Sequence, residues 1–105
     1  MDNWGEQVKR TEVTIAEMTA IGLELPADAL SMFVKNGNMY LSPPGTDLEL
    51  TKPGDIIASF HKDFCLFTVH GRCRFSGLYA WLLTGERFPV KLPPKHLLIQ
   101  GGTQL

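Results

Sequence analysis

The chain has 105 residues and a mass of 11.7 kDa, a length that fits one domain of ordinary size. Its 44% apolar and 20% charged residues are typical of a soluble globular protein and argue against intrinsic disorder. Ten basic and eleven acidic side chains give a formal net charge of -1, so no overall positive field attracts phosphate backbones or acidic lipid. We therefore expect no nucleic-acid partner.

The sequence also predicts no membrane segment and a cytoplasmic location. The longest nearly uncharged stretch, Phe64 to Val69, is far too short to span a bilayer. Asp2 and Glu6 stand at the N-terminus, where a signal peptide requires cations and then an apolar run. The two cysteines, Cys65 and Cys73, lack the Cys-x-x-Cys spacing of a zinc or redox site, so we expect reduced, partly buried thiols.

The first third of the chain predicts two helices. Val8, Ile15, Met18 and Ile21 recur near helical spacing, and Thr14 to Glu17 has the Ser/Thr-x-x-Glu spacing of a capping box, which predicts a helix within residues 6–21. Gly22 is expected to end this helix as its C-terminal cap. Proline is tolerated in the first turn of a helix, and Pro26 stands at such a position. The apolar residues that follow it predict a second short helix that ends before Asn36-Gly37.

The sequence beyond Gly37 predicts strands. Short apolar runs alternate there with Gly/Pro turns such as Lys52-Pro53-Gly54-Asp55, which is typical of a sandwich or barrel. The expected strands are Met39–Leu41, Ile56–Phe60, Phe64–Val69, Leu78–Leu82, Phe88–Val90 and Leu97–Gln100. The predicted fold class is therefore mainly β with N-terminal helices (α+β), with the helices packed on the sheet.

The triplet His61-Lys62-Asp63 is the strongest candidate for a metal site. Residues i and i+2 of a strand point to the same face, so the imidazole and the carboxylate are expected to converge on one ion. Two histidines and one carboxylate are the ligand set of non-haem iron(II) oxygenases, and this triplet offers two of the three. A pattern of three residues recurs by chance in many chains. The alternative interpretation of His61 and Asp63 is that they are charged surface residues or cap a turn.

Longer stretches of sequence support the triplet. The best match to a known pattern runs from Phe60 to Arg72 and continues through Arg74-Phe75, Gly77-Leu78 and Trp81. Shorter matches are Ala16-Glu17-Met18 with Gly22-Leu23, Leu41 to Glu49, and Val90 to Pro94 with Leu97 to Gln100. With these segments the chain resembles, from Thr14 to Gln104, the isopenicillin N synthase-like branch of the iron(II)- and 2-oxoglutarate-dependent oxygenases.

The resemblance implies a fold, two cofactors and an activity. It implies one partial oxygenase domain over residues 1–105, with a helical lead-in at 1–36 and the strands of a partial double-stranded β-helix, or jelly roll, at 37–105. It makes His61 and Asp63 the first two ligands of iron(II), and it implies 2-oxoglutarate as co-substrate. A small molecule is the implied substrate of the oxidation.

The chain also departs from the family pattern. Lys62 stands where relatives commonly carry tyrosine, and Phe64-Cys65 replaces a Leu-Asn type pair. In the family, the second iron-binding histidine and the arginine that pairs with 2-oxoglutarate lie beyond the position of Leu105. We therefore expect an oxygenase fragment or split half that is inactive by itself. The alternative is a catalytically inactive jelly-roll module that binds a partner.

His96 and His70 are the other two histidines of the chain and thus the remaining imidazole candidates for the third ligand. His96 follows Pro93-Pro94-Lys95 where the family has no ligand, so we expect it in solvent. His70 is an odd number of residues from Asp63, which places it on the opposite face of a continuous strand and favours a turn or supporting role.

Further polar and aromatic residues have structural interpretations. Arg72 and Arg74 would suit a dicarboxylate but are expected in a loop, and Cys65 and Cys73 lack a nucleophile's partners. Core packing is expected for Tyr40 and Ser42, and alternating core and surface positions for Phe75, Tyr79 and Trp81. Open strand edges are expected to favour self-association or pairing with a complementary chain.

Overall fold

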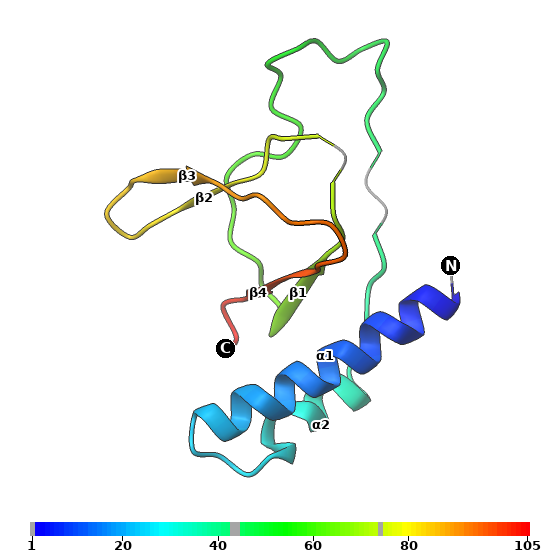
Figure 1. Cartoon of the computed structure of the whole chain (residues 1–105), viewed down its shortest axis with the longest axis vertical. Coiled ribbons are helices and arrows are strands. Elements are labelled where there is room, and N and C mark those ends of the chain that lie inside the picture. Colours follow the sequence, from blue (N-terminus) through cyan, green and yellow to red (C-terminus); the bar gives the residue numbers. More distant parts are fainter. Residues whose placement is uncertain (1, 43–44, 74) are drawn as a thin grey trace. The chain divides into compact units, whose positions relative to one another are not determined.

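A computed structural model describes residues 2–42, 45–73 and 75–105 of the chain (Figure 1). It contains two helices and four short strands, so the predicted α+β class is confirmed. The chain divides into two compact units, Met1–His61 and Lys62–Leu105. Both helices belong to the first unit and all four strands to the second, and the change of character predicted at Gly37 lies inside the first unit.

The two predicted helices are present, and the first is longer than expected. Helix α1 spans Asp2–Gly22 and helix α2 spans Asp28–Asn36. Thr14 is not a helix cap, because it lies in the middle of α1 and its Oγ1 donates a hydrogen bond to the Arg10 carbonyl at 3.1 Å. The Thr14-x-x-Glu17 spacing thus occurs within a continuous helix, where a Thr hydroxyl bonds back to the preceding turn.

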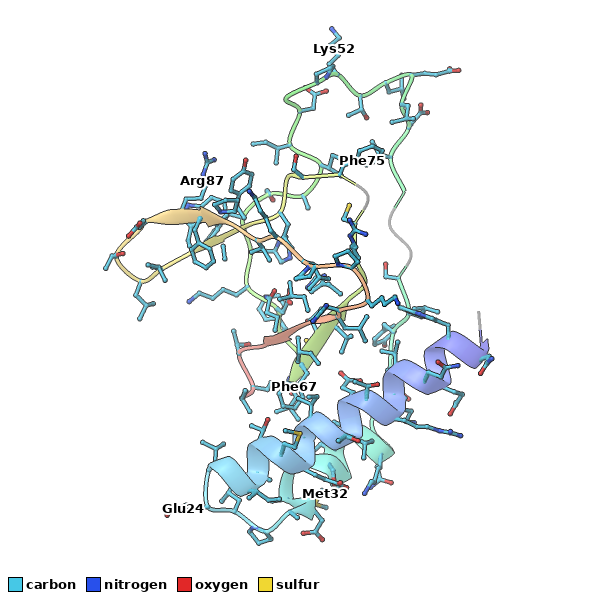
Figure 2. All side chains as sticks on the ribbon, in the orientation of Figure 1. Glu24, Met32, Lys52, Phe67, Phe75 and Arg87 are labelled. Carbon is cyan, nitrogen blue, oxygen red and sulfur yellow. The ribbon has the colours of Figure 1, made fainter. Side chains whose placement is uncertain are left out.

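Helix α1 ends in a Schellman motif whose left-handed residue is Glu24, shown in Figure 2. The Leu25 amide donates to the Ala20 carbonyl at 2.9 Å, and the Glu24 amide donates to the Ile21 carbonyl at 3.0 Å. Glu24 has φ 59, a conformation that glycine adopts at lower cost. Gly22 is the last residue of α1, but the capping conformation predicted for it belongs to Glu24.

The helix pair packs through small side chains. The buried residues of α1 are four apart, and they face buried Ser31 and Val34 of α2. The α1 residues of this buried stripe are Val8, Glu12, Ala16 and Ala20. Ala16, Ala20 and Ser31 are fully buried, so the two helices approach closely. At the surface, Lys35 Nζ lies 3.0 Å from Glu17 Oε1 and links the helices.

The described residues between α2 and the end of the first unit form turns without strands. The expected strands at Met39–Leu41 and Ile56–Phe60 are therefore wrong, since neither run has a neighbouring strand to supply backbone hydrogen bonds. The predicted turn at Lys52-Pro53-Gly54-Asp55 is confirmed. Gly54 has φ 97, and the Asp55 amide donates to the Lys52 carbonyl at 3.1 Å, as in a type II turn.

The second unit nests one antiparallel strand pair inside another. Strand β1 (Phe67–His70) pairs with β4 (Leu98–Gly101), while β2 (Tyr79–Trp81) pairs with β3 (Arg87–Pro89) in a hairpin between them. Gly85, at φ 86, completes the three-residue loop of this hairpin. Four of the six predicted strands are thus present: β1 and β2 are shorter than expected, and β3 and β4 have the expected length but are shifted by one residue.

The four strands form two separate two-stranded sheets, and the described residues contain no closed barrel. Every strand of these sheets has a single neighbour and one open edge. Phe67 is the buried apolar side chain of the second unit. None of the helices in the described ranges combines the length and apolar character needed to cross a bilayer.

The C-terminal residues extend the outer strand pair toward the start of the second unit. The Gly102 amide donates to the Leu66 carbonyl at 3.0 Å, and the Thr103 amide donates to the Asp63 carbonyl at 2.9 Å. A Cβ atom on Gly102 would overlap the Cys65 carbonyl oxygen. Glycine at this position therefore permits a close approach of two backbone segments.

Candidate functional site

His61 lies in an irregular segment before β1, and its side chain is exposed. Its ring is held by a local hydrogen bond, with Nδ1 2.7 Å from the Ser59 carbonyl oxygen. A carbonyl only accepts, so Nδ1 carries the proton and the lone pair of a neutral ring is on Nε2. Metal-binding histidines typically donate one ring N–H to a carbonyl in this way.

Asp63 is half-buried and lies in the same irregular segment. Its backbone carbonyl accepts the Thr103 amide, which ties it to the residues that follow β4. Because β1 begins only at Phe67, the strand geometry expected for His61 and Asp63 is absent, and the alternation argument for a shared face does not apply. The backbone bonds that continue from β1 and β4 to Asp63 are irregular and do not form a strand ladder.

His61 is the last residue of the first unit and Asp63 belongs to the second, so their convergence on one ion stays a prediction. Across the described ranges, no group of three or more His, Cys, Asp and Glu side chains is arranged to hold a metal ion. A third ligand is thus not supplied by these parts of the chain.

The two remaining histidines differ in environment. His96 is exposed, as expected, and its Nδ1 lies 2.9 Å from the Pro94 carbonyl, the same local bond that His61 makes. His70 is the last residue of β1 and is half-buried. Its Nε2 atom is buried and has no hydrogen-bond partner among the described residues.

The thiols expected to be partly buried are both exposed, and neither forms a disulfide. Cys65 Sγ lies 3.0 Å from Thr68 Oγ1, a local contact between residues three apart in the sequence. Arg72 is exposed in a loop, as expected, whereas Arg74 lies outside the described residues.

The aromatic residues singled out by the sequence are not core residues. Tyr40 is 91% exposed and Ser42 is exposed too, so the core packing expected for them is wrong. Phe75, Tyr79 and Trp81 are all exposed, so the alternation of core and surface positions expected for them is absent. Tyr79 and Trp81 lie on one face of β2 with their rings edge to face at 6.5 Å, and the Arg87 guanidinium is 4.4 Å from the Tyr79 ring centre. The hairpin thus carries a small exposed aromatic and cationic cluster.

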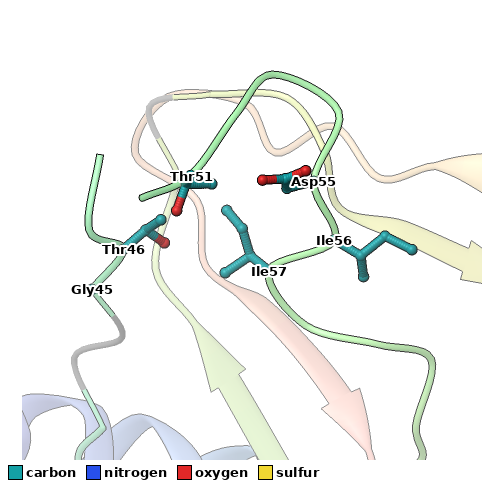
Figure 3. Close-up of a pocket in the computed structure, with 6 residues that line it drawn as sticks. All are labelled: Gly45, Thr46, Thr51, Asp55, Ile56 and Ile57. Carbon is teal, nitrogen blue, oxygen red and sulfur yellow. The ribbon is translucent and has the colours of Figure 1, made fainter. Parts of the chain in front are cut away.

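A hollow of about 510 Å³ lies in the turns of the first unit (Figure 3). Figure 3 shows the Asp55 carboxylate pointing toward Thr51, with Ile56 directed away. One Asp55 oxygen already accepts the Lys52 amide at 2.8 Å. This carboxylate therefore stabilises the type II turn, and we assign it no catalytic role.

A second cavity, of about 280 Å³, lies in the second unit, and sequence reasoning missed it. It is lined by the end of β1, the residues after it, and both sides of the hairpin base. Its polar residues include His70, Arg72, Ser76 and Lys91, and its apolar residues include Leu78, Val90 and Leu98. The pairing of β1 with β4 brings these residues together, a long-range contact that the local pattern does not encode.

Comparison of the chain with protein-family models, with curated proteins and with solved structures gives no match.

Proposed function

We propose that this chain is part of an iron(II)- and 2-oxoglutarate-dependent oxygenase and carries two ligands of its iron, His61 and Asp63. The observation that carries the proposal is the orientation of His61, whose Nδ1 lies 2.7 Å from the Ser59 carbonyl oxygen, the local bond that metal-binding histidines typically make. The resemblance of the segment from Phe60 to Arg72 to this oxygenase family supports the same residues. The proposed complete fold is the jelly roll of that family.

An imidazole nitrogen and a carboxylate oxygen are donors that suit iron(II). With 2-oxoglutarate, the metal would supply the oxidising chemistry, and the protein would exclude water and orient a small-molecule substrate. The third protein ligand and the cation that orients the keto acid would come from a further segment or a second chain, because the described residues contain no third ligand group.

Metal binding tests the ligand assignment directly. We expect weak, reversible binding of Fe(II) or Co(II), measured by anaerobic equilibrium dialysis, and loss of most of it in His61→Ala and in Asp63→Asn. His96→Ala is the matched control, because His96 is also exposed and bonded to a carbonyl two residues before it. Glu86→Gln controls for loss of one negative charge. Unchanged binding in both ligand variants would place the metal elsewhere and remove the proposal.

Turnover separates an enzyme from a binding protein. With Fe(II), ascorbate and 2-oxoglutarate, we expect the chain alone to form little or no succinate. A second chain with the family's later strands should restore succinate formation if the chain is part of an oxygenase. Succinate formed by the chain alone and abolished by Asp63→Asn would show that the two ligands suffice.

The second candidate function is a catalytically inactive binding module. It is favoured by the lack of a third ligand group in the described parts of the chain. Under this proposal, no added chain restores turnover. A partner would instead bind through the open edges and exposed apolar residues of the strand pairs.

We also propose that the chain associates with itself or with a complementary chain, and that it is cytoplasmic, as its free thiols suggest. The chain exposes 9040 Å² of surface. A globular monomer of this mass exposes about 5,900 Å², and two separate units of half the mass together expose about 7,000 Å². The excess of roughly 2,000 to 3,000 Å² is similar to the area that obligate interfaces bury.

A further inference from the structure

We infer that the cavity of the second unit is a binding site for a small organic anion, a carboxylate carried on an apolar body. The inference concerns His70, Arg72 and Lys91 and does not involve His61 or Asp63. It is therefore independent of the proposed iron site.

The apolar part of the cavity selects the body of the ligand. Leu78, Val90 and Leu98 contribute side chains from three segments, and Val90 and Leu98 are half-buried. The volume of about 280 Å³ is near the lower end of the range for small-molecule sites. An aryl group or a branched alkyl group would fill such a space and displace its water.

The backbone fixes the shape of this apolar part. The Val90 amide donates to the Leu78 carbonyl at 2.9 Å at the base of the hairpin, and Leu98 stands opposite His70 in the β1 and β4 register. Because strand pairs position both walls, the cavity is formed before a ligand arrives, which lowers the entropic cost of binding.

The polar part of the cavity selects the charge. Arg72 and Lys91 are both cationic and line the cavity, and no Asp or Glu is among its described lining residues. A guanidinium binds a planar carboxylate through two parallel hydrogen bonds, and a lysine adds a point charge. Two cations beside an apolar wall therefore favour an organic carboxylate over a neutral ligand.

His70 also lines the cavity, at the end of β1. A ligand bound there would lie against the imidazole ring, so His70 reports on whether the cavity is occupied.

The test uses phenylacetate as the probe and 2-phenylethanol as its neutral counterpart, titrated into the full chain by calorimetry. We expect saturable binding of phenylacetate and at least tenfold weaker binding of the alcohol. Lys91→Gln and Arg72→Gln should each raise the Kd for phenylacetate about tenfold or more, because each removes a positive charge that faces the carboxylate. Lys95→Gln, an exposed lysine outside the cavity lining, should change the Kd less than about twofold.

Ring ¹⁵N shifts on the unmodified chain keep the test independent of how the variants fold. The chain has three histidines, so His61 and His96 serve as internal references. Phenylacetate should shift the ring nitrogens of His70 and leave those of the other two unchanged. Equal binding of the alcohol, displacement by an equal concentration of inorganic phosphate, or no change at His70 would each overturn the inference.

Discussion

Glu12 is a charged side chain in the buried stripe between the two helices. It is 9% exposed, and its Oε2 atom has no hydrogen-bond partner among the described residues. Burial raises the pKa of the Glu12 carboxyl above its ordinary value, and the positive charge of Lys9 only partly offsets this effect. The folded helix pair therefore holds this proton more tightly than the unfolded chain does.

The raised pKa gives the stability of the fold a pH dependence of known sign. Stability from Glu12 is fully present below the unfolded pKa, and it is lost as pH rises through the higher folded pKa. Glu12→Gln should therefore increase the free energy of unfolding at pH 7 by about 1 kcal/mol and remove this part of the pH dependence. Urea unfolding of both proteins from pH 4 to pH 8 measures the difference.

Glu6→Gln is the matched control for Glu12→Gln, because Glu6 lies on the same helix and is exposed. The free energy of unfolding of the Glu6→Gln variant should follow that of the unmodified chain at every pH. If the Glu12→Gln and unmodified curves stay parallel from pH 4 to pH 8, the carboxyl is not desolvated in the folded state.

Only glycine fits at position 102, because the backbone of Cys65 lies too close for a side chain. A Cβ at this position would overlap the Cys65 carbonyl oxygen, and neither backbone segment can give way like a flexible side chain. Gly102→Ala should lower the free energy of unfolding by about 2 kcal/mol, measured by urea denaturation. At Gly101 an added Cβ meets only the flexible end of Leu105, at 3.0 Å, so Gly101→Ala should have little effect. Similar losses in the two variants would contradict the close approach.

The sequence alone predicts the residue types of the candidate site better than their geometry. His61 and Asp63 are identified by their spacing and surroundings, but the bond that orients His61 depends on the backbone at Ser59, which no pattern specifies. The cavity at His70 was missed because its walls come from residues far apart in the sequence. The sequence does contain one signal for this cavity, because Arg72 and Lys91 each lie close to an apolar run that forms a strand.

At the scale of secondary structure, the end of α1 has a residue that does not suit its conformation. Glu24 has φ 59 in the Schellman motif, where a side chain costs about 1 kcal/mol relative to glycine. Glu24→Gly should raise the free energy of unfolding by about that amount, measured by urea denaturation of the helical circular dichroism signal. Glu6→Gly, within α1, should lower it by a similar amount. A loss of stability in Glu24→Gly would show that its side chain matters more than its backbone.

Local and long-range structure differ in how well the sequence predicts them. The helices were expected from apolar spacing, since their hydrogen bonds join residues four apart. The runs Met39–Leu41 and Ile56–Phe60 have the apolar character of strands but form none, because a strand also needs a neighbour. The strand predicted at Phe64–Val69 begins only at Phe67 for the same reason, and the extended strand geometry assumed for His61 and Asp63 is absent.

At the scale of the whole molecule, the exposed surface predicts association. Several large apolar side chains expose more than four-fifths of their surface, among them Leu48, Ile56 and Phe64. Sedimentation velocity should show a mass above 11.7 kDa that decreases on dilution, because apolar burial drives association. Sodium sulfate should shift the equilibrium toward the larger species. A constant monomer mass from micromolar to millimolar concentration would contradict this prediction.

The nested strand pairs of the second unit also have a consequence for the order of folding. Trp81 and Arg87 are close in sequence, so the inner hairpin closes a short loop and should form within microseconds. Phe67 and Gly101 enclose that whole hairpin, and their pairing must wait for the closure of a much longer loop. The walls of the His70 cavity include Leu98 of β4, so the cavity is complete only after β4 has paired with β1. Fluctuations that separate β4 from β1 would open this cavity while the hairpin stays intact.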